Sequence, residues 1–368
     1  MSEAPVYVPI VKGKQFDILA TKELDSTARA KLMPLIEAMP ADLKKSALDE
    51  HIVKFCDRIR KHLPKGRLFV DFRGIDPEAT VDGGVNAILF GFQLLKMNGR
   101  PVTPVYGLAR NDALWAKLGE IAQDFNQGFC FRLTGDDLDD FAVEDTWEQI
   151  VERTADIGLP FGRVDILVDF GSITATSLKA LHEKVVAFLH YNPEAYKFRT
   201  IIIAGSSALK DVSGIDKEGT QDVRRRELDL WRRLWIDLPE GVRPVFSDYG
   251  IVHPDFSDIG ANPYINAKIR YTAGSIIRYF RGHGLRLPVN DYAQYRGLAA
   301  KVRNSSLYVG TNASFGDRYI DECANYITST PGAPGTWVKA DMNSHMSHTV
   351  AQMVEALAEL ESQVAIQP

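Results

Sequence analysis

Residues 164–207 read VDILVDFGSITATSLKALHEKVVAFLHYNPEAYKFRTIIIAGSS, and this stretch decides the fold. Continuous apolar runs at 164–171 and 199–207 flank a segment, 176–190, in which apolar residues recur at helical spacing. Such runs suit strands that are covered on both faces, and an intervening helix supplies the long crossover that parallel neighbours need. The stretch therefore predicts a parallel strand–helix–strand unit.

The same unit recurs through the first 250 residues. Strands are expected at 6–12, 31–37, 67–73, 101–107, 128–134, 164–171, 199–207 and 243–250. Helices are expected at 14–29, 46–63, 84–98, 111–125, 145–157, 176–190 and 219–236. Eight such units close a (β/α)8 TIM-like barrel. A doubly wound open sheet is the alternative, but it favours a glycine-rich first turn, which KGKQFD at 12–17 is not.

The period breaks after residue 250. AGSIIRYFRG at 273–282 has helix-like spacing, a further helix is expected at 291–303, and an amphipathic helix spans about 347–364. Part of this region should complete the eighth unit. The domain prediction is a barrel over 1–290 with a C-terminal extension, 291–368, packed against it.

Composition excludes several classes of protein. The 368 residues are 45% hydrophobic and 25% charged, which is ordinary for a globular chain, and the net charge of −5 argues against nonspecific binding to nucleic acid or acidic membranes. A local basic patch could still bind either. The opening MSEAPVYVPIVKGK is not a signal peptide, no run is long enough for a membrane span, and the three cysteines form no CxxC pair. A cytoplasmic location is expected.

Charged residues recur at the predicted strand ends, where barrel active sites form. They are Lys12, Glu37, Asp71, Arg73, Arg132, Asp169 and Asp248. Each shares its strand face with an apolar residue, so each could lie just above an apolar layer. These charges either pair with one another and close the top of the barrel, or bind an anionic or zwitterionic ligand through the cations.

Candidate roles follow from side-chain chemistry. The carboxylates Glu37, Asp71, Asp169 and Asp248 are candidate general acids and bases, or ligands of a hard ion such as Mg²⁺, although their spacing is not diagnostic of a metal site. The candidate ligand-binding residues are Lys12, Arg73, Arg132, Ser206, Tyr249, His253 and Arg270. Ser206 is included because backbone N–H groups in a Gly-Ser turn can bind phosphate.

Other motifs carry less information. His345 and His348 have a spacing that could ligate a metal, but we interpret them as residues at a helix start. Helix 219–236 has Leu228, Trp231 and Trp235 on one stripe and Arg225, Arg226, Arg232 and Arg233 largely on another, which suits an outer barrel helix or a contact with a protein or nucleic acid. The chain contains no GxxxxGK[ST], HExxH or GxSxG motif and no GxGxxG after a strand, so ATPase, zincin, α/β-hydrolase and dinucleotide chemistry are poorly supported.

The sequence resembles the beta protein family, whose members occur in satellite bacteriophages and bacterial genomes, often near mobile elements. The resembling motifs are YVPIVKGKQ (7–15), PLIE (34–37), VDFR (70–73), VDFG (168–171), RRREL..W (224–231), SDYGIVHP (247–254), IRYT (269–272), SFGDRYI (314–320) and GTW (335–337). The resemblance implies a role in phage–host conflict and supplies no catalytic residue. In the family an acidic residue often follows the first glycine–lysine pair, whereas Gln15-Phe16-Asp17 follows it here.

Two hypotheses for function remain open. One is an enzyme or ligand sensor that binds a phosphorylated or nucleotide-like molecule at the barrel mouth, with phosphoester hydrolysis as its reaction if it is an enzyme. The other is a catalytically inert barrel that binds proteins encoded nearby in a defence locus, or neutralises a toxin.

Overall fold

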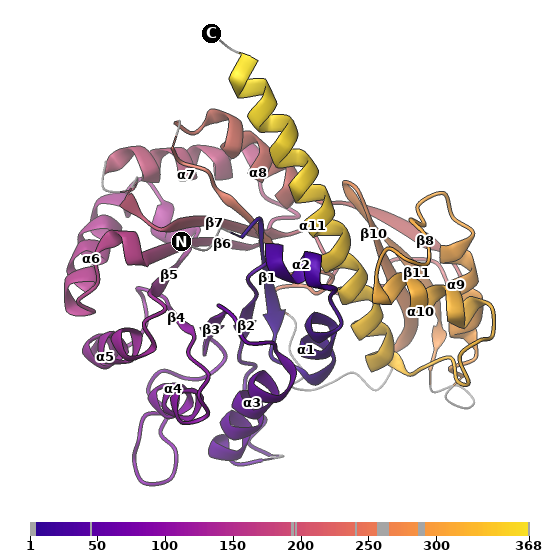
Figure 1. Ribbon diagram of the computed structural model, residues 1–368, viewed down its shortest axis with the longest axis horizontal. Coiled ribbons are helices and arrows are strands. Elements are labelled where there is room, and N and C mark those ends of the chain that lie inside the picture. The colour runs from indigo at the N-terminus through magenta and orange to yellow at the C-terminus, as the bar shows by residue number, and fades with distance from the viewer. Residues whose placement is uncertain are drawn as a thin grey trace.

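The barrel predicted from the sequence is confirmed. The computed structural model describes residues 5–44, 46–192, 195, 197–239, 241–255, 265–285 and 291–366. Eight parallel strands close in the order in which they follow one another along the chain, and the last pairs with the first (Figure 1). They are β1 (Tyr7–Lys12), β2 (Leu35–Glu37), β3 (Phe69–Asp71), β4 (Thr103–Tyr106), β5 (Phe129–Thr134), β6 (Val164–Ser172), β7 (Thr200–Ser206) and β9 (Val245–Asp248).

Helices surround the barrel where the apolar spacing predicted them. They are α1 (Gln15–Lys22), α2 (Ser26–Lys31), α3 (Leu48–His62), α4 (Ala87–Met97), α5 (Trp115–Phe125), α6 (Val143–Asp156), α7 (Leu178–Tyr191) and α8 (Arg226–Asp237). Short 3-10 turns are η1 (Asp112–Leu114), η2 (Asp136–Leu138) and η3 (Phe161–Arg163). The segment expected as one helix at 14–29 divides because Asp25 caps α2, accepting hydrogen bonds from the N–H groups of Thr27 and Ala28.

The prediction of a helix at 273–282 was wrong. The start of the helix predicted at 219–236 was also wrong. Both segments are strands, β11 (Ile276–Gly284) and β8 (Thr220–Arg224), in an antiparallel sheet of order β10-β11-β8 with β10 (Asn266–Ala273). Gly274, with φ of +53°, makes the tight turn between β10 and β11. We call β10, β11 and β8 the appended sheet.

Three further helices complete the chain: α9 (Gln294–Arg303), α10 (Phe315–Ala324) and α11 (Pro334–Ile366). The helix predicted at 291–303 is confirmed as α9, and the helix predicted at 347–364 begins earlier, at Pro334. α11 packs against α1, α2 and β1 and so takes the eighth place around the barrel (Figure 1).

Helix α11 also joins two apolar cores. Met342, Met346 and Val350 belong to the core between the barrel and its helices, while Trp337 and Ala340 belong to a second core with β10, β11, α9 and α10. The appended sheet therefore packs onto the barrel through a helix that belongs to both cores.

The division of the chain at residue 290 stays a prediction. In the described part of the chain, no helix is long and apolar enough to cross a bilayer.

Candidate functional site

The mouth of the barrel is centred on Arg132, near the end of β5. Its Nη1 donates to Glu37 Oε2 at 2.9 Å and to Asp71 Oδ2 at 2.6 Å, and its Nε and Nη2 donate to Asp169 Oδ2 at 3.0 and 2.6 Å. All four side chains are buried. One guanidinium thus donates hydrogen bonds to three strand ends at once, which its planar fork of donors allows.

A second ring of cations pairs with the same carboxylates. Arg110 donates to both oxygens of Asp71, at 2.7 and 3.1 Å, and Lys12 Nζ lies 2.6 Å from Glu37 Oε1. Arg73 Nη1 lies 3.2 Å from Asp169. Sequence reasoning missed Arg110, which comes four residues after β4 ends and carried no signal beyond that position. We call these four cations, the three carboxylates and Tyr249 the mouth network.

Tyr249 closes the mouth network. Its hydroxyl donates to Asp169 Oδ2 at 2.6 Å and accepts from Arg132 Nη2 at 2.8 Å, and Lys12 Nζ lies 5.1 Å from the centre of its ring. Burial and the nearby Asp169 raise the pKa of Tyr249 well above its ordinary value. The phenol therefore remains a hydrogen-bond donor at neutral pH.

The carboxylates of this network form ion pairs with cations, which lower the pKa values of Asp71 and Asp169. Burial alone would raise the pKa of Asp71, but Arg110 and Arg132 bring it down to about 2. The pKa of Asp169 is likewise lowered, because Arg132 and Arg73 outweigh its burial. A carboxylate with so low a pKa is a weak general base. Six of the seven strand-end charges thus come together, and they pair chiefly with one another.

Asp248, the seventh, points elsewhere, so its predicted place in the mouth was wrong. Its Oδ1 accepts from the Tyr7 hydroxyl at 2.5 Å, and its Oδ2 lies 3.2 Å from Arg225 Nη2 and 3.0 Å from His345 Nε2. Asp248 shares a strand face with Phe246, as predicted, but Phe246 packs in the core between strands and helices. Strand parity identifies a shared face without telling which face is inside.

The two histidines of α11 are structural. His345 joins Asp248 of the barrel to Thr272 of β10, whose Oγ1 lies 2.7 Å from His345 Nδ1, and His348 Nε2 lies 2.9 Å from Asp317 Oδ2. Both lie in the interior of α11, not at its start as interpreted from the sequence. Among the described residues, no group of three or more His, Cys, Asp or Glu side chains could hold a metal ion.

Ser206 and the arginines of α8 are less available than the sequence suggested. Ser206 is buried, and its hydroxyl accepts from the N–H of Ala208. Arg225 is fully buried, and Arg226 donates to the carbonyl groups of the loop that follows β6. Arg232 and Arg233 are exposed.

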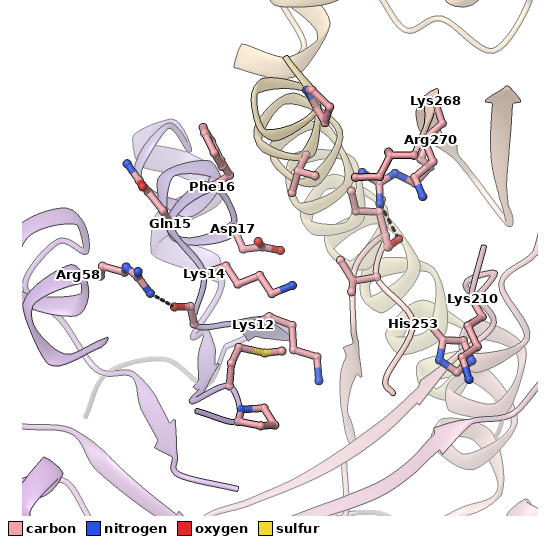
Figure 2. A pocket seen from close by; sticks show the side chains of 18 of the residues that line it. Lys12, Lys14, Gln15, Phe16, Asp17, Arg58, Lys210, His253, Lys268 and Arg270 are labelled. Carbon is pink, nitrogen blue, oxygen red and sulfur yellow. Dashed lines mark hydrogen bonds between the residues drawn. The ribbon is translucent and has the colours of Figure 1, made fainter. Parts of the chain in front are cut away.

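A cavity of about 640 Å³ lies beside the mouth network, between the barrel and the appended sheet (Figure 2). Lys12, His253 and Arg270, of the predicted ligand-binding residues, line it, whereas Arg73, Arg132, Ser206 and Tyr249 do not. Its charged lining comprises seven cations, Lys12, Lys14, Lys54, Arg58, Lys210, Lys268 and Arg270, and two carboxylates, Asp17 and Asp42. The cavity therefore lies to the side of the strand tips, toward the appended sheet, and the predicted ligand site stays a prediction.

The cavity has two charged walls, which face each other in Figure 2. The barrel wall comes from β1, α1, the loop after β2 and α3, and both lining carboxylates belong to it. The sheet wall comes from β10, the loops after β7 and β9, and the start of α11, and it contributes Lys210, Lys268 and Arg270. Charge on the sheet wall is therefore of one sign among the described lining residues.

Lys268 and Arg270 differ in their partners. Asp341 Oδ2 accepts from both the backbone N–H and the Nε of Arg270, each at 3.0 Å. For Lys268 the structure gives no hydrogen bond or ion pair of its amino group with any described residue. Burial and the neighbouring Arg270 lower the pKa of Lys268 to about 8. Sequence reasoning missed Lys268 because β10 was not predicted; in a strand, 268 and 270 share a face.

His253 completes the lining as a neutral side chain. The N–H of Asp255 donates to its Nδ1 at 3.2 Å, and burial lowers its pKa below the ordinary value. At neutral pH it is therefore an uncharged imidazole beside Lys210 (Figure 2).

Comparisons with known proteins give one family match and several remote structural likenesses. A family model described as Beta protein matches residues 7–351. Among solved structures, triosephosphate isomerase from Bartonella henselae is 12% identical with a TM-score of 0.35, over 67% of this chain and 94% of its own. Alanine racemase from Clostridium difficile 630, in complex with cycloserine, is 12% identical with a TM-score of 0.34, over 67% and 50%. The YdjI aldolase from Escherichia coli K12 is 8% identical with a TM-score of 0.37, over 96% and 91%. Likenesses this remote carry no argument about fold or function, and no curated protein matches the chain.

Proposed function

The chain belongs to the beta protein family, and on that premise we propose that it binds a small anionic ligand in the cavity between the barrel and the appended sheet. The observation that carries the proposal is charge. Seven lysine and arginine side chains line the cavity against two aspartates, in a chain whose net charge is −5. A concave site in which one sign of charge predominates attracts ligands of the opposite sign, and phosphate and carboxylate are the groups that Lys and Arg bind best.

The mouth network shares one residue, Lys12, with the cavity and holds it in place. Lys12 belongs both to that network and to the cavity lining, and its ion pair with Glu37 and its 2.8 Å hydrogen bond to the Pro254 carbonyl hold its amino group in place. A cation fixed before the ligand arrives loses less entropy on binding. In this proposal Lys12 contacts the ligand at the edge of the site, and the other strand-tip charges hold the mouth in place without contacting the ligand.

Hydrolysis of the ligand would require a different base from the four carboxylates named from the sequence. Asp71 and Asp169 have lowered pKa values and paired oxygens, and Asp248 faces away from the mouth. Both oxygens of Glu37 are paired as well, one with Lys12 and the other with Arg132. His253 lines the cavity and is neutral at pH 7, which is the protonation state a general base needs. If the ligand is a phosphoester that the protein cleaves, we propose His253 as the base, accepting the proton at Nδ1 in place of the hydrogen bond from the Asp255 N–H.

The biological setting is part of the same proposal. The family resemblance favours a cytoplasmic component of a phage-defence or mobile-element conflict system. An alternative is that the chain acts there as an inert partner-binding module. The exposed Arg232, Arg233 and Ile236 of α8 favour this alternative, because an exposed apolar side chain and arginines on one helix suit a protein contact. Co-purification with proteins encoded nearby would test it, and loss of the partner in Ile236→Asp would support it.

Filling the cavity tests ligand binding directly. Val338 lines it from α11, and we expect Val338→Trp to abolish binding of pyrophosphate and ATP, measured by isothermal titration calorimetry, without changing any charge. Val338→Ala is the matched control and should bind as the wild type does. If the wild type binds neither probe, or if Val338→Trp binds both unchanged, the proposal is wrong.

A further inference from the structure

The two walls of the cavity differ in how far their charges are already neutralised. On the barrel wall, Lys12 pairs with Glu37, Lys54 pairs with Glu50 at 3.2 Å, and two carboxylates line the surface. Only Arg270 on the sheet wall has an ion pair with a described residue, and its partner Asp341 lies behind it, outside the lining. The stronger uncompensated positive charge is therefore on the sheet wall.

Contacts within the protein fix the position of the Arg270 side chain. Its backbone N–H and its Nε both donate to Asp341, and its Nη1 lies 3.4 Å from the Ile251 carbonyl oxygen. Its Nη2 has no hydrogen-bond partner within the described parts of the chain. A guanidinium fixed at one edge presents its remaining N–H groups in a set direction, which is the geometry that phosphate oxygens accept.

Lys268 supplies the second charge. It lies two residues from Arg270 on the same strand face, and burial together with the like charge of Arg270 lowers the pKa of Lys268. An unpaired charge at a partly buried position lowers stability unless a ligand compensates it. A dianion between Lys268 and Arg270 would compensate both.

We infer that Lys268 and Arg270 bind the dianionic phosphate group of an organic phosphate whose body lies against the barrel wall. This inference rests on the proposed function and names its ligand class. A cavity of 640 Å³ is many times larger than a lone phosphate needs, and ligand sites for organic molecules are roughly 300–1,000 Å³. Phe16, Met39, Pro40 and Phe55 on the barrel wall provide the apolar surface for that body.

The test uses four probes at pH 7.5 and calorimetry: inorganic phosphate, phenyl phosphate, AMP and 3′,5′-cyclic AMP, which is only a monoanion. We expect phenyl phosphate and AMP to bind tighter than inorganic phosphate, and cyclic AMP to bind at least about tenfold more weakly than AMP. Lys268→Met should weaken binding of AMP and phenyl phosphate by about tenfold or more, because a charge-assisted hydrogen bond is lost. Lys268→Arg, which keeps the charge, should restore most of it.

Lys96→Met is the matched control, since Lys96 lies outside the cavity lining, is exposed and pairs with Asp124. It should change affinity by less than about threefold, as an exposed ion pair contributes little. Equal binding of AMP by wild type and Lys268→Met, or equal losses in Lys268→Met and Lys96→Met, would overturn the assignment to the sheet wall while leaving the proposed function intact. Cyclic AMP binding as tightly as AMP would overturn the dianion class, and inorganic phosphate binding as tightly as both organic probes would overturn the organic body. If no probe binds, and pyrophosphate and ATP also fail, the proposed function falls with the inference.

Discussion

The barrel mouth and the sheet wall of the cavity contain the same kinds of charged side chain in opposite states of pairing. In the mouth, three carboxylates surround Arg132 and every one accepts a hydrogen bond from it. On the sheet wall, Lys268 and Arg270 lie side by side with a single buried carboxylate, Asp341, behind them. Convergence of charge is thus a poor guide to a binding site by itself. What distinguishes a site is charge that the protein leaves uncompensated.

The largest effect that this difference predicts is on stability, at the mouth. Arg132→Met leaves Glu37, Asp71 and Asp169 buried without their shared cation. Removing one partner from a buried ion pair destabilises by about 3–5 kcal/mol, and we expect a loss of at least that order in the free energy of unfolding, measured by urea denaturation. Arg224→Met removes an exposed arginine paired with Asp229 and should cost less than about 1 kcal/mol. Equal losses in the two variants would contradict the pairing assigned to Arg132.

The next effect is the response of the mouth to acid. The pKa of Asp71 is about 2 in the folded protein, below its ordinary value of 3.8, so the stability it contributes is present above about pH 4 and is lost as the pH falls toward 2. A difference of nearly two pKa units corresponds to about 2–3 kcal/mol. Urea denaturation between pH 2 and pH 5 should therefore show a shallower acid loss in Asp71→Asn than in the wild type. The exposed Asp140→Asn should follow the wild-type profile, and parallel profiles for Asp71→Asn would refute the prediction.

Whether an element could be predicted from the sequence depended on whether its pattern of apolar residues fits a strand alone or a helix as well. All eight barrel strands were predictable because short apolar runs, of which TIIIA is the clearest, alternate with segments of helical spacing. β11 was not, because Ile276, Ile277, Tyr279 and Phe280 satisfy helical spacing as well as strand alternation. Because β10 was not predicted, the sequence did not show that Lys268 and Arg270 lie on one face of a strand.

The limits at the site have a related cause. Parity along a strand groups Asp248 with Phe246 but cannot tell the barrel interior from the helix-facing layer, and this ambiguity misplaced Asp248. The mutual pairing in the mouth was one of two readings that strand-end charges allowed. Choosing between them required distances between side chains from different strands, which a sequence pattern does not contain.

The sheet wall should respond to alkali where the mouth responds to acid. Lys268, with a pKa of about 8, faces Arg270, Asp341 and Asp211, and only its protonated form pairs with a dianion. Affinity for phenyl phosphate should therefore be fully present below about pH 8 and fall by up to about tenfold per pH unit above it. Calorimetry from pH 7 to pH 9.5 would measure this fall. Lys268→Arg should abolish it, and an unchanged slope in that variant would assign the titration to another group.

The smallest predicted effect is the sharpest test of the comparison, because its sign is opposite to that of Arg132→Met. The pKa of Lys268 is lowered in the folded protein, so its charged form is less favourable there than in the unfolded chain, and the unpaired charge reduces stability at pH 7. Lys268→Met keeps the length of the side chain and removes the charge. We expect the free energy of unfolding without ligand to stay level or rise by about 1 kcal/mol, since solvent in the cavity screens part of the cost. A loss of stability comparable to that in Arg132→Met would mean that Lys268 is paired after all, and that the two regions do not differ in the way their contacts indicate.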